Sequence, residues 1–191
     1  MSRLVLVLVV CFILVLATVI VFITAFDTFS SGFFAQQRIG KKGQLFTIYK
    51  LRTHHKHSHK VSAWGNFLRR TKIDEIPQII NILKGEMTLV DPRPDVSGYA
   101  DKLQDEDRII LTLKPGITGL ASLKYRNEEM LLAQQINPEQ YNNEVIWPDK
   151  VRINKWYAHN RTIVMNLLIL FYTFIPISFD VDRFIVRKSG K

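Results

Sequence analysis

An apolar run near the N-terminus most strongly constrains how this chain can fold. The segment Leu4–Phe26 has 23 residues and no charged side chain, and 18 of them are Leu, Ile, Val or Phe. At about −0.3 to −0.6 kcal/mol each, these residues favour insertion into a bilayer by about 5–11 kcal/mol. A helix of this length measures about 34 Å, enough for the hydrocarbon core. We predict a membrane anchor helix in residues 1–30 and a second domain in residues 31–191.

The alternative interpretation of this run is a cleavable signal peptide, because Met1–Arg3 is a short positive flank. The run is too long for a signal-peptide core, and no cleavage site of the A-x-A type follows it. The single cysteine, Cys11, excludes an intramolecular disulfide framework and a multi-cysteine zinc site. With 47% hydrophobic residues the chain is not a disordered one.

Positive charge is concentrated directly after the apolar run. Residues 28–73 contain ten Lys and Arg and no acidic residue, whereas the formal charge of the whole chain is +9. A basic cluster beside a membrane helix indicates attraction to anionic lipid and a cytoplasmic location for this side. Nucleotide phosphates or nucleic acid are the other anionic ligands that such a segment favours.

The patterns beyond the anchor predict a helix-rich α+β domain. We expect a strand at Phe46–Leu51, a loop at 53–60, a short amphipathic helix at 63–70 and a helix at Glu75–Leu83 that Gly85 follows. Thr71 and Asp74 resemble a capping box for this helix. Residues 87–90 are expected to be extended.

Three further helices are predicted in the second half, at about 105–113, 127–135 and 150–172. The uncharged run at 162–179 is open to two interpretations. It forms either a core helix or an interfacial helix, with Trp147, Trp156 and Tyr157 at the level of the lipid headgroups.

Three local patterns could support chemistry. Asp74 and Glu75 follow three basic residues in six, and an acidic helix start is explained by capping or by a site for Mg²⁺ and phosphate. Arg93 lies between Pro92 and Pro94, which suits either an ordinary turn or a fixed anion clamp. The third pattern is a histidine run, interpreted mainly as a solvated loop and alternatively as a Zn²⁺ or Cu²⁺ site. Its members are His54, His55, His57 and His59.

Six motifs in one order, from about Phe33 to Tyr172, resemble the bacterial sugar transferases, the monotopic phosphoglycosyl transferases that start lipid-linked glycan assembly. The motifs are Gln37-Arg38-Ile39-Gly40, the strand motif at 46–53, the dyad motif at 67–78, Leu83–Val90 with Pro92-Arg93-Pro94, Pro115–Ser122 and Trp147–Asn154. Each motif alone is weak, whereas their order is specific.

The resemblance implies transfer of a sugar 1-phosphate from a UDP-sugar to a polyprenyl phosphate, usually undecaprenyl phosphate, with release of UMP. It implies that Asp74 is the nucleophile and that Glu75, with Asp74, holds Mg²⁺. It also implies phosphate binding by Arg69 and Arg93, and by Lys50 and Arg52 in the strand motif. The expected location is the cytoplasmic face of a bacterial inner membrane, with anionic lipid and no nucleic acid as partner.

The chain departs from the family pattern in three places. Leu4–Phe26 contains neither Pro nor Gly, so a spanning helix is an alternative to the family's re-entrant hairpin. Asp91 replaces the usual Gly before Pro-Arg-Pro and adds a charge near the expected clamp. The stretch between Arg52 and Phe67 is short and carries the histidines. A catalytically degenerate, membrane-tethered protein that binds a partner or nucleic acid is therefore the competing hypothesis.

Overall fold

The computed structural model describes residues 3–58, 60–175 and 177–190; for residues 3–4, 6–10 and 13–14 it describes the backbone only. The chain divides into two compact units. The first unit comprises residues 1–36 and 47–81, and the second comprises residues 37–46 and 82–191. The predicted boundary between an anchor and a catalytic domain at residue 30 stays a prediction.

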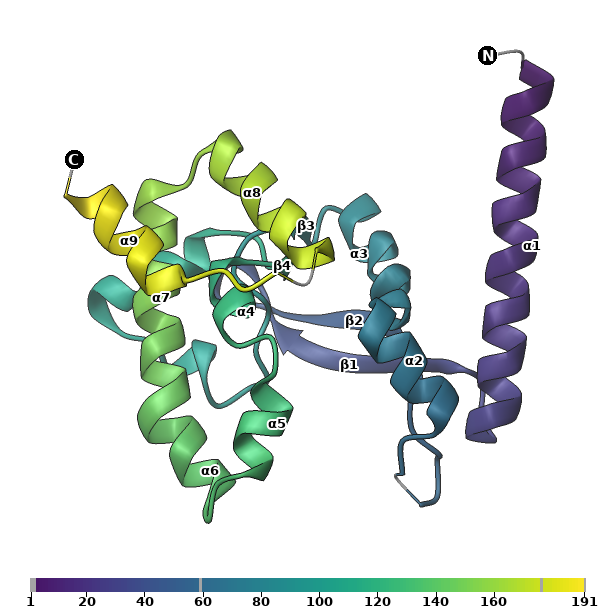
Figure 1. Cartoon of the computed structure of the whole chain (residues 1–191), viewed down its shortest axis with the longest axis horizontal. Helices are drawn as coiled ribbons and strands as arrows, with labels where there is room; N and C mark the ends of the chain where they lie inside the picture. Colours follow the sequence, from purple (N-terminus) through teal and green to yellow (C-terminus); the bar gives the residue numbers. More distant parts are fainter. Residues whose placement is uncertain (1–2, 59, 176, 191) are drawn as a thin grey trace. The chain divides into compact units, whose positions relative to one another are not determined.

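The first unit contains the long N-terminal helix and the segments around the acidic pair (Figure 1). Its helices are α1 (Arg3–Thr28), α2 (Ala63–Thr71), the 3₁₀ helix η2 (Ile73–Gln78) and α3 (Ile79–Leu83), whose end runs into the second unit. The hairpin of β1 (Phe33–Ile39) and β2 (Leu45–Leu51) is shared between the units. Over the stretches that the structure describes, no helix has both the length and the hydrophobicity needed to cross a membrane.

Polar side chains join α2 to the end of α1. The Trp64 indole donates to Thr24 Oγ1 at 3.0 Å, and Ser62 Oγ donates to Asp27 Oδ2 at 2.6 Å. Ser62 also caps α2, because its Oγ accepts from the Gly65 N–H at 2.9 Å. Ser62 therefore serves both as helix cap and as a link to α1.

The second unit is mainly helical and carries a small parallel sheet (Figure 1). Strands β3 (Thr88–Val90) and β4 (Gly116–Thr118) pair in parallel, with Thr88 opposite Gly116 and Val90 opposite Thr118. The α-helices are α4 (Leu120–Lys124), α5 (Glu128–Ala133), α6 (Pro138–Tyr141), α7 (Trp147–Asn160), α8 (Ile163–Phe174) and α9 (Val181–Ser189). The remaining helical turns are η1 (Lys41–Gly43), η3 (Ala100–Lys102), η4 (Asp105–Thr112) and the π-helical η5 (Asn142–Ile146).

The core of the second unit forms where α4, α7, α8 and α9 meet the parallel strands. Leu120, Ile153, Tyr157 and Ile169 are at most 1% exposed. Burial of such side chains contributes about 1.5–3 kcal/mol each, which makes this cluster the main hydrophobic stabilisation of the unit.

The long helix predicted at 150–172 is wrong, because α7 and α8 are separate. Arg161 between them is extended, with ψ 136°, and Thr162 caps α8 by accepting from the Met165 N–H at 3.1 Å. The headgroup position that the interfacial interpretation gave to Tyr157 is wrong, since this side chain is 1% exposed in the core.

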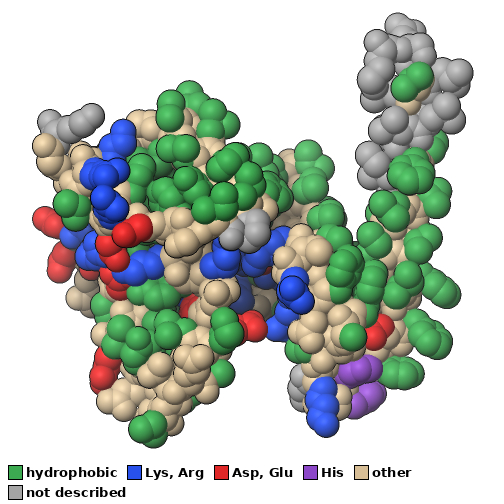
Figure 2. Space-filling model, in the orientation of Figure 1, with side chains coloured by type: hydrophobic (Ala, Val, Ile, Leu, Met, Phe, Trp, Pro, Cys, Tyr) green, Lys and Arg blue, Asp and Glu red, His purple; other side chains and the backbone are tan. Residues whose placement is uncertain are grey.

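The core interpretation of the uncharged C-terminal run is confirmed for one face of α8, and the interfacial interpretation stays a prediction. Met165 and Ile169 are buried, as in a core helix. Six other apolar side chains of α8 are 39–80% exposed, and Figure 2 shows hydrophobic side chains gathered over this helix. The exposed side chains are Ile163, Val164, Leu167, Leu168, Phe171 and Phe174.

The predictions for the smaller elements are largely confirmed. The helix-rich α+β class, the strand ending at Leu51, the short helix after it and the extended segment before Asp91 are all present. The helix predicted at 75–83 begins as a 3₁₀ turn and becomes α-helical only at Ile79. Gly85 follows it with φ +74°, the left-handed conformation that glycine adopts without strain.

Gly65 is a position in the first unit where a neighbouring backbone segment lies too close to admit a side chain. A Cβ on this residue would overlap the carbonyl oxygen of Thr53. We expect Gly65→Ala to lower the free energy of unfolding by about 1–3 kcal/mol, since overpacking forces the helix away from its neighbour. Thermal and denaturant unfolding would measure this loss. The matched control is Asn66→Ala, at an exposed position of the same helix. An equal loss of stability in both variants would contradict the conclusion that Thr53 leaves no room for a side chain at position 65.

Candidate active site

The two adjacent carboxylates, Asp74 and Glu75, directly follow a sharp turn in the first unit. Lys72 ends α2 in the left-handed conformation, with φ 59° and ψ 16°, and η2 begins at the next residue. Thr71 Oγ1 donates back to the Phe67 carbonyl at 2.8 Å. The predicted capping box of Thr71 and Asp74 is therefore wrong, because Thr71 belongs to the end of the preceding helix.

Asp74 and Glu75 are both buried, at 8% and 7% exposure. Lys50 on β2 lies beside them, and its Nζ is 3.1 Å from Glu75 Oε1. A buried ion pair of this kind needs a close partner, because a lone buried charge is costly. Lys50 of the strand motif and Glu75 of the dyad motif are therefore in direct contact.

Asn81 places β2 beside the acidic turn, and this role was not predicted from the sequence. Its side chain is fully buried, its Oδ1 accepts from the Tyr49 N–H at 3.3 Å and its Nδ2 donates to the Thr47 carbonyl at 2.7 Å. The available signal was a single amide within the apolar sequence Ile79-Ile80-Asn81-Ile82-Leu83. A buried amide in such a helix requires polar partners.

The two other basic residues predicted in this unit are held by different contacts. Arg69 Nε donates to Thr53 Oγ1 at 2.8 Å, and Thr53 is 5% exposed. The Arg52 guanidinium carbon lies 5.4 Å from the ring centre of Phe34, as in a cation–π contact. Phosphate binding by Arg69 and Arg52 stays a prediction.

Burial raises the pKa of the Asp74 carboxyl, and the negative charge of Glu75 acts in the same direction. Lys50, Lys72 and Arg69 lower the pKa of Asp74 and thus oppose this effect. The site therefore holds a carboxylate that is more basic than in water yet surrounded by cations. Such a group is suited to nucleophilic attack on a phosphorus atom.

The acidic pair also fits the predicted Mg²⁺. Among the described residues, Asp74 Oδ1 is one of the few buried side-chain atoms without a hydrogen-bond partner. Mg²⁺ is commonly held by one or two carboxylates together with substrate phosphates. Over the same described part of the chain, no group of three or more His, Cys, Asp or Glu side chains is placed to hold a metal.

The histidine run lies in the loop after β2. His54 packs edge-on against Phe34 with 5.8 Å between ring centres, and His55 stacks on Phe29 at 5.7 Å. His57 is exposed, and His59 lies outside the described residues. These contacts give two of the histidines a packing role in the first unit.

Arg93 belongs to the second unit, and its predicted phosphate binding stays a prediction. The charge of Arg93 acts on both Asp95 and Arg38, and the Ile39 N–H donates to the Asp95 carbonyl at 2.9 Å. Burial raises the pKa of Asp95 to about 6, against the opposing charges of Lys150, Arg38 and Arg93. The position of this carboxylate among basic side chains was not predicted from the sequence.

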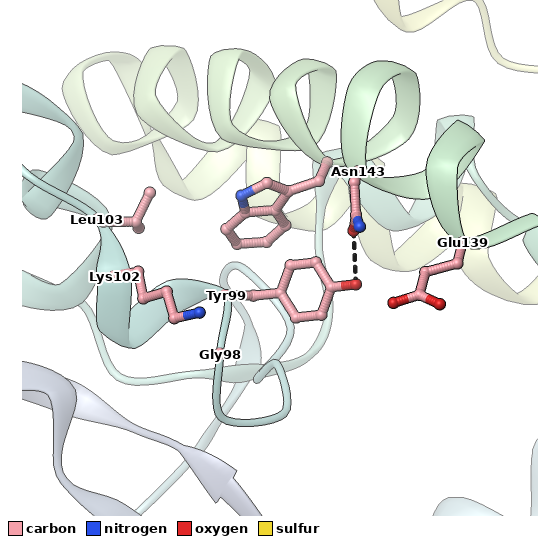
Figure 3. Close-up of a pocket in the computed structure, with 7 residues that line it drawn as sticks. Gly98, Tyr99, Lys102, Leu103, Glu139 and Asn143 are labelled. Atoms are coloured by element: carbon pink, nitrogen blue, oxygen red, sulfur yellow. Dashed lines mark hydrogen bonds between the residues drawn. The ribbon is translucent and has the colours of Figure 1, made fainter.

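A shallow cavity of about 450 Å³ lies elsewhere in the second unit (Figure 3). Tyr99 and Trp147 meet edge to face with 5.2 Å between ring centres, and the Tyr99 hydroxyl donates to Asn143 Oδ1 at 2.8 Å. The full lining is Gly98, Tyr99, Lys102, Leu103, Glu139, Asn143 and Trp147. The cavity thus contains none of the predicted site residues.

Removing the cation beside the acidic pair should make Asp74 harder to ionise. Lys50 is the largest of the charges that lower the pKa of Asp74, so we expect Lys50→Met to raise this pKa further. A carbon-13 NMR titration of the carboxyl groups, with Asp74→Asn for assignment, would measure it. The control is Arg70→Met, which removes an exposed positive charge at the position next to Arg69. An unchanged or lower pKa in the Lys50 variant would refute the electrostatic description.

Comparison with known proteins gives one consistent result. A family described as bacterial sugar transferase matches residues 1–180. The undecaprenyl-phosphate galactose phosphotransferase of Salmonella typhimurium is 29% identical over 184 residues, which cover 82% of this chain and 34% of that protein. The uncharacterized sugar transferase EpsL of Bacillus subtilis is 31% identical over 154 residues, which cover 75% of this chain and 68% of that protein.

The galactosyl transferase CpsE of Streptococcus agalactiae is 33% identical over 141 residues, covering 61% of this chain and 31% of that protein. This chain thus spans about a third of the Salmonella and Streptococcus relatives and about two thirds of the Bacillus relative. The match over residues 1–180 confirms the family predicted from the ordered motifs. The chain belongs to the bacterial sugar transferase family.

Proposed function

We propose that the chain transfers a sugar 1-phosphate from a UDP-sugar to a polyprenyl phosphate and releases UMP. The observation that carries the proposal is the buried pair Asp74 and Glu75, beside Lys50 and in the same unit as Arg69, in a member of this family. The Salmonella relative is named for undecaprenyl phosphate and galactose, which supports this class of donor and acceptor. The sugar itself stays open.

In the first step, a carboxylate oxygen of Asp74 attacks the phosphorus that carries the sugar. A bond forms between this oxygen and phosphorus, and the bond from phosphorus to the bridging oxygen breaks. UMP leaves with the electron pair of that bond, and the sugar phosphate remains as an acyl phosphate on Asp74. The carboxylate must be ionised to attack, so activity should fall as the pH drops through the raised pKa of Asp74.

In the second step, a phosphate oxygen of the polyprenyl phosphate attacks the same phosphorus. The new bond gives a polyprenyl diphosphate sugar, and Asp74 leaves as a free carboxylate. Two successive displacements allow one site to process a water-soluble donor and a lipid acceptor in turn. The high basicity of a buried carboxylate favours the first attack, and the nearby cations favour its departure.

Basic residues of both units would bind and orient the phosphates in this proposal. Lys50 holds the Glu75 carboxylate at 3.1 Å, and Arg69 is oriented by Thr53. Asp74 and Glu75 would hold Mg²⁺, which when bound neutralises phosphate charge. Arg93, fixed between two prolines, would bind a phosphate oxygen through its guanidinium group.

We further propose that the protein acts at the cytoplasmic face of a bacterial inner membrane. The uncharged run Leu4–Phe26 would hold it there, and exposed basic residues of 28–73 such as Lys56, Lys60 and Arg70 would contact anionic lipid. The exposed apolar side chains of α8, such as Leu167 and Phe171, would lie at the lipid surface. This arrangement would give the site access to a lipid acceptor.

Removal of the proposed nucleophile should abolish turnover. We expect Asp74→Asn to lower UMP release from a UDP-sugar, with Mg²⁺ and undecaprenyl phosphate present, by about a thousandfold or more. A panel of UDP-sugars assayed with purified membranes would identify the donor first. Asp101→Asn, which changes an exposed carboxylate of the second unit, should keep wild-type turnover. Normal turnover in the Asp74 variant would exclude the proposed nucleophile.

The side of the membrane can be determined by cysteine labelling. With Cys11 changed to serine, a cysteine introduced at the exposed Lys56 would be the single reactive thiol. A membrane-impermeant maleimide should label it in inverted vesicles and leave it unlabelled in intact spheroplasts. The reverse pattern would contradict the cytoplasmic location of this segment.

A further inference from the structure

Asp91, directly before Pro92-Arg93-Pro94, is a buried charged residue without a role in the proposed chemistry. The residue carries a carboxylate and is 4% exposed. An ionised carboxylate in this environment is costly unless other groups compensate it. Its partners therefore show what the side chain does.

Three side chains from two separate parts of the second unit meet at the Asp91 carboxylate. Thr88 Oγ1 on β3 donates to Asp91 Oδ2 at 2.9 Å. The guanidinium of Arg161, at the end of α7, lies 3.4 Å from Asp91 Oδ1. The Tyr157 hydroxyl donates to Asn166 Oδ1 on α8 at 2.7 Å, and Tyr157 also acts to lower the pKa of Asp91.

These partners account for the tolerance of a buried charge at this position. Burial raises the pKa of Asp91, whereas Thr88, Arg161 and Tyr157 all act to lower it. Arg161 is about half exposed and lies in the extended break between α7 and α8. The carboxylate thus ties the start of the Pro92-Arg93-Pro94 segment to this break.

The backbone at Asp91 is fixed as tightly as the side chain. Its N–H donates to the Thr118 carbonyl at 3.0 Å, and the Gly116 N–H donates to the Pro92 carbonyl at 2.9 Å. A Cβ on Gly116 or Gly119 would overlap backbone atoms of Asp91. Pro92 and Pro94 then restrict φ on both sides of Arg93. The backbone between Asp91 and Arg93 therefore has little conformational freedom.

We infer that Asp91 is a positioning residue, whose buried contacts with Thr88, Tyr157 and Arg161 set the direction of Arg93 toward the diphosphate of the donor. The inference rests on the proposed function, because it takes the donor to be a nucleoside diphosphate sugar. Asp91 acts through Arg93 and contacts no substrate atom. Loss of its charge should therefore matter only while the Arg93 guanidinium is present.

A double-mutant cycle on UDP binding tests this dependence. Isothermal titration of the full chain in detergent, with UDP and Mg²⁺, would compare wild type, Asp91→Asn, Arg93→Ala and the double variant. We expect Asp91→Asn to weaken UDP binding about tenfold in the wild-type background and less than twofold in the Arg93→Ala background. Equal weakening in both backgrounds, as a general loss of structure would cause, overturns the inference.

A second variant keeps the inference testable if the Asp91→Asn protein does not fold. Arg161→Gln removes the exposed partner of the same ion pair, and the same dependence on Arg93 is expected for it. Arg161→Lys keeps the charge and should restore most of the UDP binding. Glu144→Gln makes the same acid-to-amide change at an exposed site of the second unit and should bind UDP like wild type. Lack of rescue by lysine would count against the ion pair.

The test separates this inference from the proposed function. UMP release by the wild-type protein reports on the transfer reaction, whereas the coupling between positions 91 and 93 reports on positioning. UMP release without such coupling would overturn the positioning role alone. Coupling in UDP binding without UMP release would support the positioning role and contradict the transfer reaction.

Discussion

The first unit must compensate the charge of two adjacent carboxylates that are buried away from water. Asp74 and Glu75 repel each other, and burial adds to the cost of ionising Asp74. Lys50 on β2 offsets this cost, but only if β2 is held beside η2. The buried amide of Asn81 supplies that connection through its hydrogen bonds to Thr47 and Tyr49. The site therefore depends on a hydrogen-bonded strand as much as on its acids.

The second unit also contains a buried carboxylate, and different groups compensate its charge. Asp91 is also buried, and its charge is compensated by Arg161 and by hydroxyl groups from Thr88 and Tyr157. The glycines of the Pro115–Ser122 motif allow the strand backbones to approach at this point. The motif thus has a packing explanation in addition to its value for recognising the family.

Several elements could be predicted because their signals are local. The strand ending at Leu51 is rich in β-branched and aromatic residues, and the turn at Gly85 follows an apolar helix. Predictions failed where side chains outside the pattern decided the backbone. Lys72 in the left-handed conformation separates Thr71 from Asp74, and Thr162 caps a new helix where the apolar pattern predicted a continuous one. Neither choice is visible in hydrophobic periodicity.

The sequence by itself determined the family, the apolar and basic segments and the identity of the candidate residues, because the order of motifs and the placement of charge are properties of the linear chain. Tertiary structure alone decided which of these residues meet. Lys50 and Glu75 are 25 positions apart, and Asp91 and Arg161 are 70 apart. Contacts over such separations, and the burial that raises the pKa of Asp74, arise only when distant segments pack together.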